Sequence, residues 1–200
     1  MEEVNRATNS ARVFGLGPTN DPVSEVISSK FLVGEQGARD ALFISFDASP
    51  VDWQAVCRRS DEWSGGNIGV IRVGRPTRGD QKTTEIADEL GAESVTIKHV
   101  PRADELSKLG IVATKLLSKL EQTPRQTVVY FHTLSAIHQH IGTKNLFRFL
   151  NTLHSRLSNS DTIGYYQMNP ELHDEIVIET LRPLFETVIR FSTEGNLTVE

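Results

Sequence analysis

The chain has 200 residues and a mass of 22.3 kDa, a length that favours one globular domain with a sizeable core. Hydrophobic residues make up 38% and charged residues 24%, which excludes disordered, collagen-like and low-complexity chains. The net charge is −5, and the basic residues are scattered without an Arg/Lys run. We therefore expect no nucleic-acid partner.

The lengths of the hydrophobic runs and the number of cysteines indicate where in the cell the protein is expected. Uncharged apolar runs such as Thr127–Phe131 fall far short of the roughly 20 residues that a bilayer requires. The first residues, Met1-Glu2-Glu3, are acidic where a signal peptide carries bases. Cys57 is the single cysteine, so no intrachain disulfide and no thiolate cluster can form. These features predict a soluble, cytoplasmic protein without a membrane partner.

Seven short apolar runs rich in β-branched residues predict buried strands of a mostly parallel sheet. In chain order they are Val13–Leu16, Ala41–Phe46, Ile68–Val73, Val95–Val100, Thr127–Phe131, Ile163–Met168 and Val188–Phe191.

Helical spacing of apolar residues lies between most of these runs. It predicts helices from Pro22 to Phe31, from Pro50 through Cys57, from Ala103 to Glu121, from Thr143 to Leu157 and from Pro170 to Thr180. Strands that alternate with helices require crossover connections, which place helices on both faces of the sheet. We expect one α/β domain over residues 1–200, with residues 1–10 as a flexible N-terminal tail.

Ligands of open α/β sheets bind outside the carboxyl ends of the strands. The candidate site positions there are Gly15 and Gly17 after the first strand, Asp47 after the second, His132 after the fifth and Gln167 in the sixth.

The first of these turns, Gly15 to Pro22, is the place for a phosphate-binding loop. Such a loop reads G-x-x-x-x-G-K-[ST], and this segment has neither the second glycine nor the Lys-Ser/Thr pair at that spacing. Its two prolines remove N–H donors, and Asp21 adds a negative charge. The alternative is a tight strand-to-helix turn that binds no ligand.

The fifth strand ends in His132, where P-loop enzymes place the aspartate that positions Mg²⁺. A neutral imidazole is a poor ligand for this hard ion. The structural alternative for His132 is a buried imidazole that is hydrogen-bonded to a neighbouring strand. Asp47 can orient a water molecule or simply cap the next turn.

The histidines do not predict a metal site. His138 and His140 are two residues apart, so on a helix they point about 200° away from each other. His132, His154 and His173 add no H-E-x-x-H pattern, and no second cysteine is present. We therefore expect no bound metal. Cys57 is expected to be a small buried apolar residue.

Three segments resemble RecA/KaiC-like ATPases. Ala41–Pro50 resembles their second strand and following turn, Thr127–Ile137 their Walker B strand, and His173–Ile189 their closing region. The chain is most similar to an uncharacterised haloarchaeal branch of this superfamily, whose members commonly lack a Walker A motif. The resemblance implies a RecA-like three-layer α/β/α sandwich with a mostly parallel central sheet.

Carried onto this chain, the resemblance implies a degenerate site. The Walker A lysine and hydroxyl have no counterpart in Gly15–Pro22, His132 replaces the Mg²⁺-binding Asp, and Asp47-Ala48 keeps half of an acidic pair. Because phosphoryl transfer depends on positioned charge and metal, we expect no ATPase activity and no cofactor. The domain would act as a regulatory or protein-interaction module, pairing with itself or with a related RecA-like subunit.

Two alternatives remain at this point. One is a weak or non-standard nucleotide-binding ATPase that uses Asp47 and Gln167. The other is an enzyme of another class, in which His132 and Asp47 form a dyad of general base and orienting carboxylate.

Overall fold

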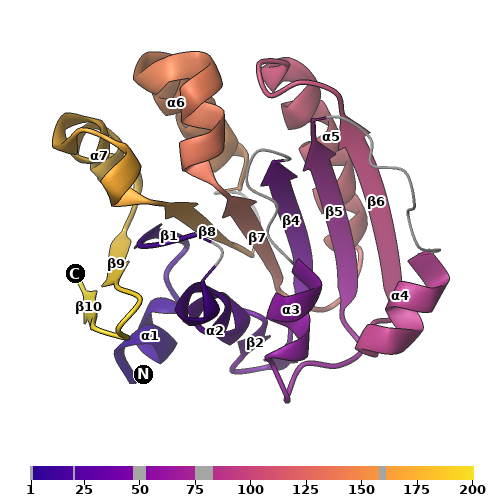
Figure 1. Cartoon of the computed structure of the whole chain (residues 1–200). Coiled ribbons are helices and arrows are strands. Elements are labelled where there is room, and N and C mark those ends of the chain that lie inside the picture. The colour runs from indigo at the N-terminus through magenta and orange to yellow at the C-terminus, as the bar shows by residue number, and fades with distance from the viewer. Residues whose placement is uncertain (1, 20, 47–52, 75–82, 158–160) are drawn as a thin grey trace.

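The computed structural model describes residues 2–19, 21–46, 53–74, 83–157 and 161–200. Within this part of the chain, eight strands form one sheet in the order β10-β9-β1-β8-β7-β4-β5-β6 (Figure 1). All neighbouring strands are parallel except β10, which pairs antiparallel with β9. The strands are β1 (Arg12–Leu16), β4 (Asp40–Phe46), β5 (Asn67–Val73), β6 (Ser94–Val100), β7 (Thr127–His132), β8 (Thr162–Met168), β9 (Thr187–Phe191) and β10 (Leu197–Val199).

The seven predicted strands are confirmed to within one residue at each end, and β10 is an addition. Their side chains alternate between two cores. Val129 and Phe131 of β7 join one core, while Val128 and Tyr130 join the other. The inner strands β1, β8, β7, β4 and β5 are buried on both faces along nearly their whole length, which explains their continuous apolar runs in the sequence.

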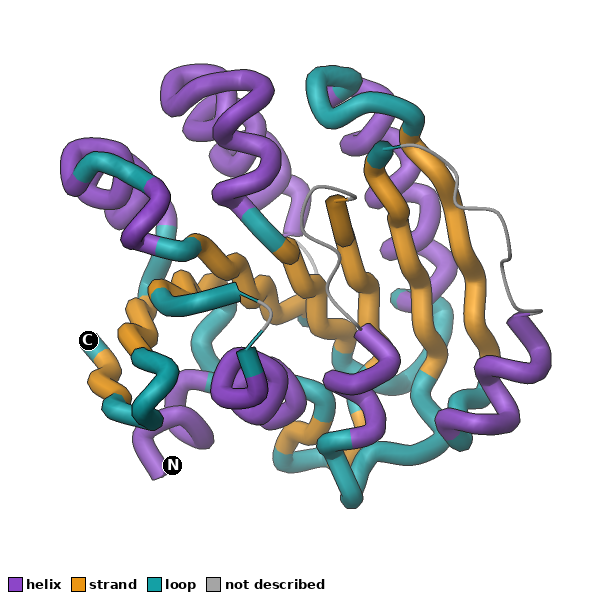
Figure 2. The backbone as a smooth tube through the Cα atoms, in the orientation of Figure 1, coloured by secondary structure: helices purple, strands orange, loops and turns teal. Residues whose placement is uncertain are grey.

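Helices cover both faces of the sheet, so the predicted three-layer α/β/α architecture is confirmed (Figures 1 and 2). One face carries α1 (Glu2–Ala7), α2 (Pro22–Lys30), α3 (Trp53–Arg58) and α4 (Thr83–Leu90), and the other carries α5 (Leu106–Leu120), α6 (Leu134–Leu157) and α7 (Glu175–Leu181). Among the described helices, none has both the length and the hydropathy to cross a bilayer.

The N-terminal segment differs from the expected flexible tail. Residues 2–7 form α1, and the side chains of Val4 and Ala7 are buried in the same core as α2 and α3. A helix of this length is too short to be stable alone. Burial of these two apolar side chains supplies the tertiary contacts that it requires.

Other elements also depart from the sequence prediction. A small hairpin, β2 (Val33–Gly34) with β3 (Gly37–Ala38), and the helix α4 were not predicted. Helix α6 begins at Leu134, directly after β7, and Gly142 interrupts it with φ 72° and ψ 168°. The helix predicted from Thr143 is therefore the second part of α6. The last predicted helix divides into the 3₁₀ turn η1 (Pro170–Leu172) and α7, and a second turn η2 (Arg182–Leu184) precedes β9.

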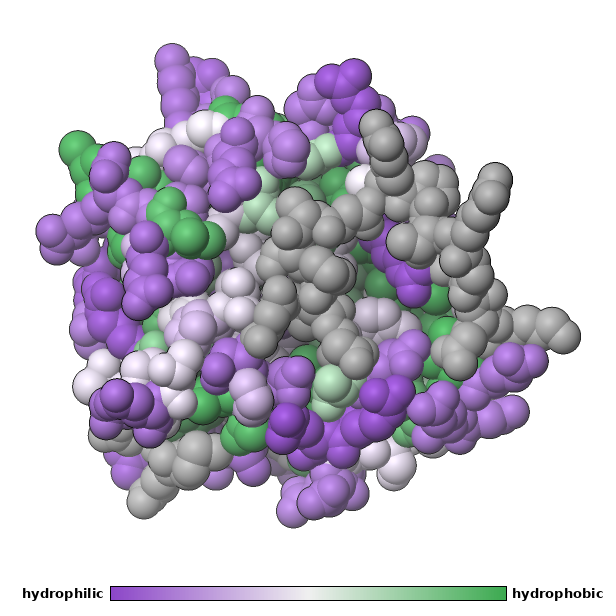
Figure 3. Space-filling model, viewed as in Figure 1, coloured by the Kyte–Doolittle hydropathy of each residue, from purple (hydrophilic) through white to green (hydrophobic). Residues whose placement is uncertain are grey.

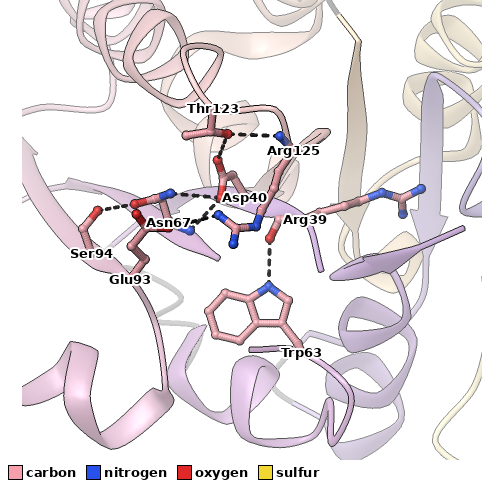
Figure 4. A network of polar contacts seen from close by, with 8 residues as sticks. All are labelled: Arg39, Asp40, Trp63, Asn67, Glu93, Ser94, Thr123 and Arg125. Atoms are coloured by element: carbon pink, nitrogen blue, oxygen red, sulfur yellow. Dashed lines mark hydrogen bonds and ion pairs between the residues drawn. The ribbon is translucent and has the colours of Figure 1, made fainter. Parts of the chain in front are cut away.

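A buried polar network closes the amino-terminal edge of the sheet (Figure 4). Asp40 is fully buried at the start of β4, and its carboxylate accepts hydrogen bonds from the Asn67 backbone N–H (2.7 Å) and the Thr123 hydroxyl (2.6 Å). The Asn67 side chain accepts a further bond from the Ser94 hydroxyl (2.6 Å). Asp40 thereby links β4 to β5 and to the loop before β7.

Arg39 extends this edge toward α2. Its guanidinium donates to the Gln126 side chain (2.6 Å) and to the Phe31 carbonyl (3.1 Å), while its own carbonyl accepts from the Trp63 indole (2.8 Å). Burial lowers the pKa of Arg39. Arg39 and Asp40 are thus engaged in structural contacts at this end of the sheet.

Replacing Asp40 by alanine should destabilise the protein by about 3 kcal/mol, because it leaves the buried Asn67 N–H and the Thr123 hydroxyl without their acceptor. Chemical unfolding monitored by circular dichroism measures this loss. The matched variant Asp104→Ala removes a carboxylate that pairs with Arg102 at the surface, and its unfolding midpoint should not change. Equal effects of the two substitutions would contradict the structural role of Asp40.

Candidate functional site

The sheet order brings most of the predicted site positions to one edge. Strands β1, β8 and β7 are neighbours, and in their register Gly15 of β1 lies beside Gln167 of β8. His132 ends β7, next to β8, the strand that carries Gln167. Asp47 follows β4 and lies outside the described residues, so its relation to His132 stays a prediction.

The two glycines are explained by the aromatic rings beside them. A Cβ atom on Gly15 would lie 2.8 Å from Cζ of Tyr165, and one on Gly17 would lie 2.5 Å from Cε2 of Phe191. These separations are too short for carbon atoms that are not bonded. Glycine at these positions therefore makes room for rings of the adjacent strands β8 and β9.

The residue that caps the N-terminus of helix α2 is an aspartate, Asp21. The Asp21 carboxylate caps the helix by accepting a 2.8 Å hydrogen bond from the Val23 N–H, and Pro22 contributes no N–H at all. In a phosphate-binding loop the first turn of this helix offers its free N–H groups and the positive end of its dipole to the phosphate. Here a carboxylate of the chain takes that place.

Gln167 ties the turn before α2 to the sheet. Its side chain is fully buried, and its amide nitrogen donates to the Pro18 carbonyl at 2.8 Å. Its amide group also lies within hydrogen-bond distance of the Ser24 hydroxyl, which is 2.7 Å from Nε2 and 3.0 Å from Oε1. One carbonyl of the turn and one hydroxyl at the start of α2 thus bond to the interior of the protein.

Ser24 is a site residue that the sequence reasoning missed. It follows Gly17 by the spacing that separates the first glycine from the final hydroxyl of G-x-x-x-x-G-K-[ST]. In this alignment Pro22 stands at the second glycine and Val23 at the lysine. The spacing of Gly17 and Ser24 could therefore have indicated this residue, but two of the four residues that define the phosphate-binding motif are replaced. In the structure the Ser24 hydroxyl is hydrogen-bonded to Gln167.

His132 is a buried, neutral imidazole. Its side chain is packed against the rings of Tyr130 and Tyr165, and it is only 2% exposed. Burial lowers the pKa of His132 from 6.5 to about 4, and the adjacent Gln167 side chain only partly opposes this effect. Neither ring nitrogen makes a well-formed hydrogen bond to a described residue. The predicted hydrogen bond to a neighbouring strand is thus at most a weak contact with Gln167.

The other histidines fall into separate environments. His138 and His173 are in ring contact, with centroids 4.8 Å apart, and burial lowers the pKa of both. His138 also bonds to the Thr143 hydroxyl at 2.9 Å. His140 is exposed, while His154 packs against Tyr166 and Phe185 in the core. Across the described ranges, no three metal-ligating side chains converge.

Cys57, the single cysteine, is buried on α3 and packs in the core shared with α2 and α4. This placement fits the expectation of a small apolar residue. The three described side chains gathered around the turn before α2 are neutral or negative: the Gln167 amide, the His132 imidazole and the Asp21 carboxylate.

Comparison with known proteins places this geometry in a family and a fold. Residues 11–191 match the model of a family of unknown function, DUF7504. No curated protein matches the chain in sequence.

Two solved structures from Pyrococcus horikoshii OT3 are similar in fold. One, studied under Project ID PH0250, is 9% identical with a TM-score of 0.56, and the match covers 99% of this chain and 90% of that one. The other, the KaiC-like protein PH0186, is 10% identical with a TM-score of 0.52, covering 92% of this chain and 72% of that one. The RecA-like fold class is confirmed, whereas the haloarchaeal branch stays a prediction.

A double-mutant cycle can test the packing role of Gly17. Gly17→Ala should cost about 2 kcal/mol, because its Cβ forces the Phe191 ring to move. In a Phe191→Ala background the same substitution should cost much less, since the obstructing ring is gone. Urea unfolding of the four proteins measures the coupling. Additive effects would show that Gly17 is required for another reason.

The pH dependence of stability can test the burial of His132. Its folded-state pKa of about 4 lies below the ordinary value of 6.5, so the unfolded chain binds the proton more tightly. The stabilising contribution is complete above about pH 6.5 and is lost as the pH falls toward 4. Relative to the wild type, His132→Asn should gain stability on acidification, by about 3 kcal/mol at pH 4. Denaturant unfolding across this pH range measures the difference.

His140→Asn provides the matched control, because His140 is exposed on α6. Its unfolding free energy should follow the wild-type pH profile. A His132 variant that also follows the wild-type profile would contradict the assignment of a buried, neutral imidazole.

Proposed function

We propose that this chain, a member of the family of unknown function DUF7504, is a RecA-like domain without nucleotide hydrolysis that acts as a regulatory, protein-interaction module. The two similar structures support the fold alone, because both are at most 10% identical to this chain. The functional proposal depends on the residues at the carboxyl-terminal edge of the sheet.

The observation that carries the proposal is the internal bonding of the turn before α2. Gln167 engages the Pro18 carbonyl and the Ser24 hydroxyl, and the Asp21 carboxylate caps the helix. A bound triphosphate would have to displace the carboxylate and break buried hydrogen bonds. It would gain no lysine in return, because Val23 stands at that position. Both effects disfavour phosphate binding.

The absence of a suitable metal ligand at β7 adds to this argument. Mg²⁺ in phosphoryl-transfer enzymes is held by oxygen ligands, and the imidazole of His132 offers none. Its lowered pKa keeps the ring uncharged at neutral pH, so it also supplies no positive charge to a phosphate. At the two positions that supply charge compensation and a metal ligand in P-loop enzymes, this chain has Val23 and His132, and neither side chain provides these contributions to phosphoryl transfer.

The alternative of a weak ATPase would require Gln167 to act on the nucleotide or on the attacking water. The Gln167 amide is fully buried and bonded to two groups of the turn, which opposes such a role. A dyad of His132 with Asp47 would require an imidazole that accepts a proton near neutral pH, and burial of the ring disfavours this.

Titration with ATP and Mg²⁺ tests the proposal. Calorimetry should give no binding heat, and the thermal midpoint of unfolding should stay constant, whereas a ligand at about 100 times its Kd would stabilise the fold by about 2.7 kcal/mol. A KaiC-like ATPase measured under the same conditions is the positive control. Saturable stabilisation by Mg–ATP would overturn the proposal in favour of the residual nucleotide binder.

The variant His132→Asp tests the missing metal ligand at β7 separately from the missing phosphate-binding loop before α2. It restores a carboxylate at the end of β7 but leaves the turn before α2 unchanged, so phosphate release from ATP should stay at the background rate. Measurable turnover by this variant would mean that the turn can bind a triphosphate after all.

A further inference from the structure

Large hydrophobic side chains exposed to solvent mark two separate surfaces. In the described part of the chain, three such residues are more than half exposed: Ile111 (54%), Leu172 (57%) and Ile176 (74%). Leu172 and Ile176 lie together in η1 and α7, whereas Ile111 lies in α5. Both surfaces belong to the helical layer formed by α5, α6 and α7.

The first surface, here named the α7 ridge, is apolar at its centre and acidic around it. Leu172 and Ile176 form its apolar part, and the space-filling view shows hydrophobic atoms exposed over α7 among hydrophilic ones (Figure 3). No lysine or arginine occurs between Pro170 and Leu181. The exposed carboxylates of the ridge are those of Glu171, Asp174, Glu175 and Glu179.

The second surface, here named the α5–α6 groove, is concave, apolar on its floor and basic at its rim. It encloses about 440 Å³ between the two helices. Ile111 and Phe149 contribute apolar surface, while Arg148 and Arg156 are exposed along α6. Helix α6 contains no aspartate or glutamate over its whole length. The groove is therefore the complement of the ridge in charge.

These charges are not neutralised within the molecule. Among the described residues, the four ridge carboxylates make no ion pair with any base. Arg148 and Arg156 likewise pair with no carboxylate, although Arg156 donates a hydrogen bond to the Thr114 hydroxyl. The two charge sets are therefore available to steer another molecule of complementary charge.

We propose that the partner of this domain is a second copy of the same chain, with the α7 ridge of one copy seated in the α5–α6 groove of the other. Leu172 and Ile176 would fill the apolar floor, and the ridge carboxylates would meet Arg148 and Arg156. The contact is heterologous, because each copy contributes a different surface to it. This assignment deepens the proposed function by naming the partner, and it is tested by association alone, without nucleotide.

Charge reversal on each surface tests the pairing. The ridge variant Glu175→Lys/Glu179→Lys and the groove variant Arg148→Glu/Arg156→Glu each place like charges across the contact. We expect the wild type to sediment above the monomer mass at low salt and each variant to associate at least about tenfold more weakly. An equimolar mixture of the two variants should recover association, since every ridge then meets a groove of opposite charge.

The control Asp61→Lys/Glu62→Lys makes the same charge change as the ridge variant at exposed positions between α3 and β5, and it should associate like the wild type. Thermal unfolding of each variant confirms its fold. A wild type that remains monomeric over the full concentration range would overturn the proposal. So would variants that still associate, or a mixture that does not recover. Each of these results leaves the ATP titration, and hence the loss of hydrolysis, to be judged separately.

Discussion

The hydrogen bonds of Gln167 set the character of the carboxyl-terminal edge of the sheet. This buried amide joins β8 to the Pro18 carbonyl and to the Ser24 hydroxyl, so it fixes the path of the chain from β1 into α2. The arrangement depends on Gly15, which lies beside Gln167 in the register and leaves space for the Tyr165 ring. An amide that both donates and accepts can satisfy such a turn internally, whereas a phosphate-binding loop keeps its donors free for a ligand.

Neutral groups also make this edge stable without a ligand. A lysine and an aspartate at the positions of Val23 and His132 would be charges that need a phosphate and a metal ion to compensate their desolvation. Val23 removes the first charge, and burial keeps His132 uncharged by lowering its pKa. The remaining charge, that of Asp21, is stabilised by the N-terminus of α2. None of these three side chains requires a bound nucleotide to balance its charge.

The sequence patterns within single strands and helices predicted the fold well. The features that they did not predict depend on contacts between elements that are distant in the sequence. The seven strands were found because residues buried on both faces of a sheet form continuous apolar runs, as in Ala41–Phe46. Helix α1 was missed because six residues are too few to show a helical period, and the helix is held by the burial of Val4 in tertiary contacts. Likewise, the positions of Gly17 and His132 in the sequence indicated where a site would lie. Their roles depended on Phe191 and Gln167, which contact them only in the folded chain.

The charge segregation between α6 and α7 is not required by the fold. Both helices pack on the sheet through buried apolar side chains, such as Leu150 and Leu181, and these contacts are independent of the charges on the outer surface. If the opposite charges served to hold α7 against α6, ion pairs between the two helices would be expected, yet none joins them among the described residues. Leu172 and Ile176 together expose two large apolar side chains four residues apart on this surface. An apolar ridge with an acidic border and an apolar groove with a basic border, on one helical layer, are therefore best explained by contact with another molecule that presents the same pair of surfaces.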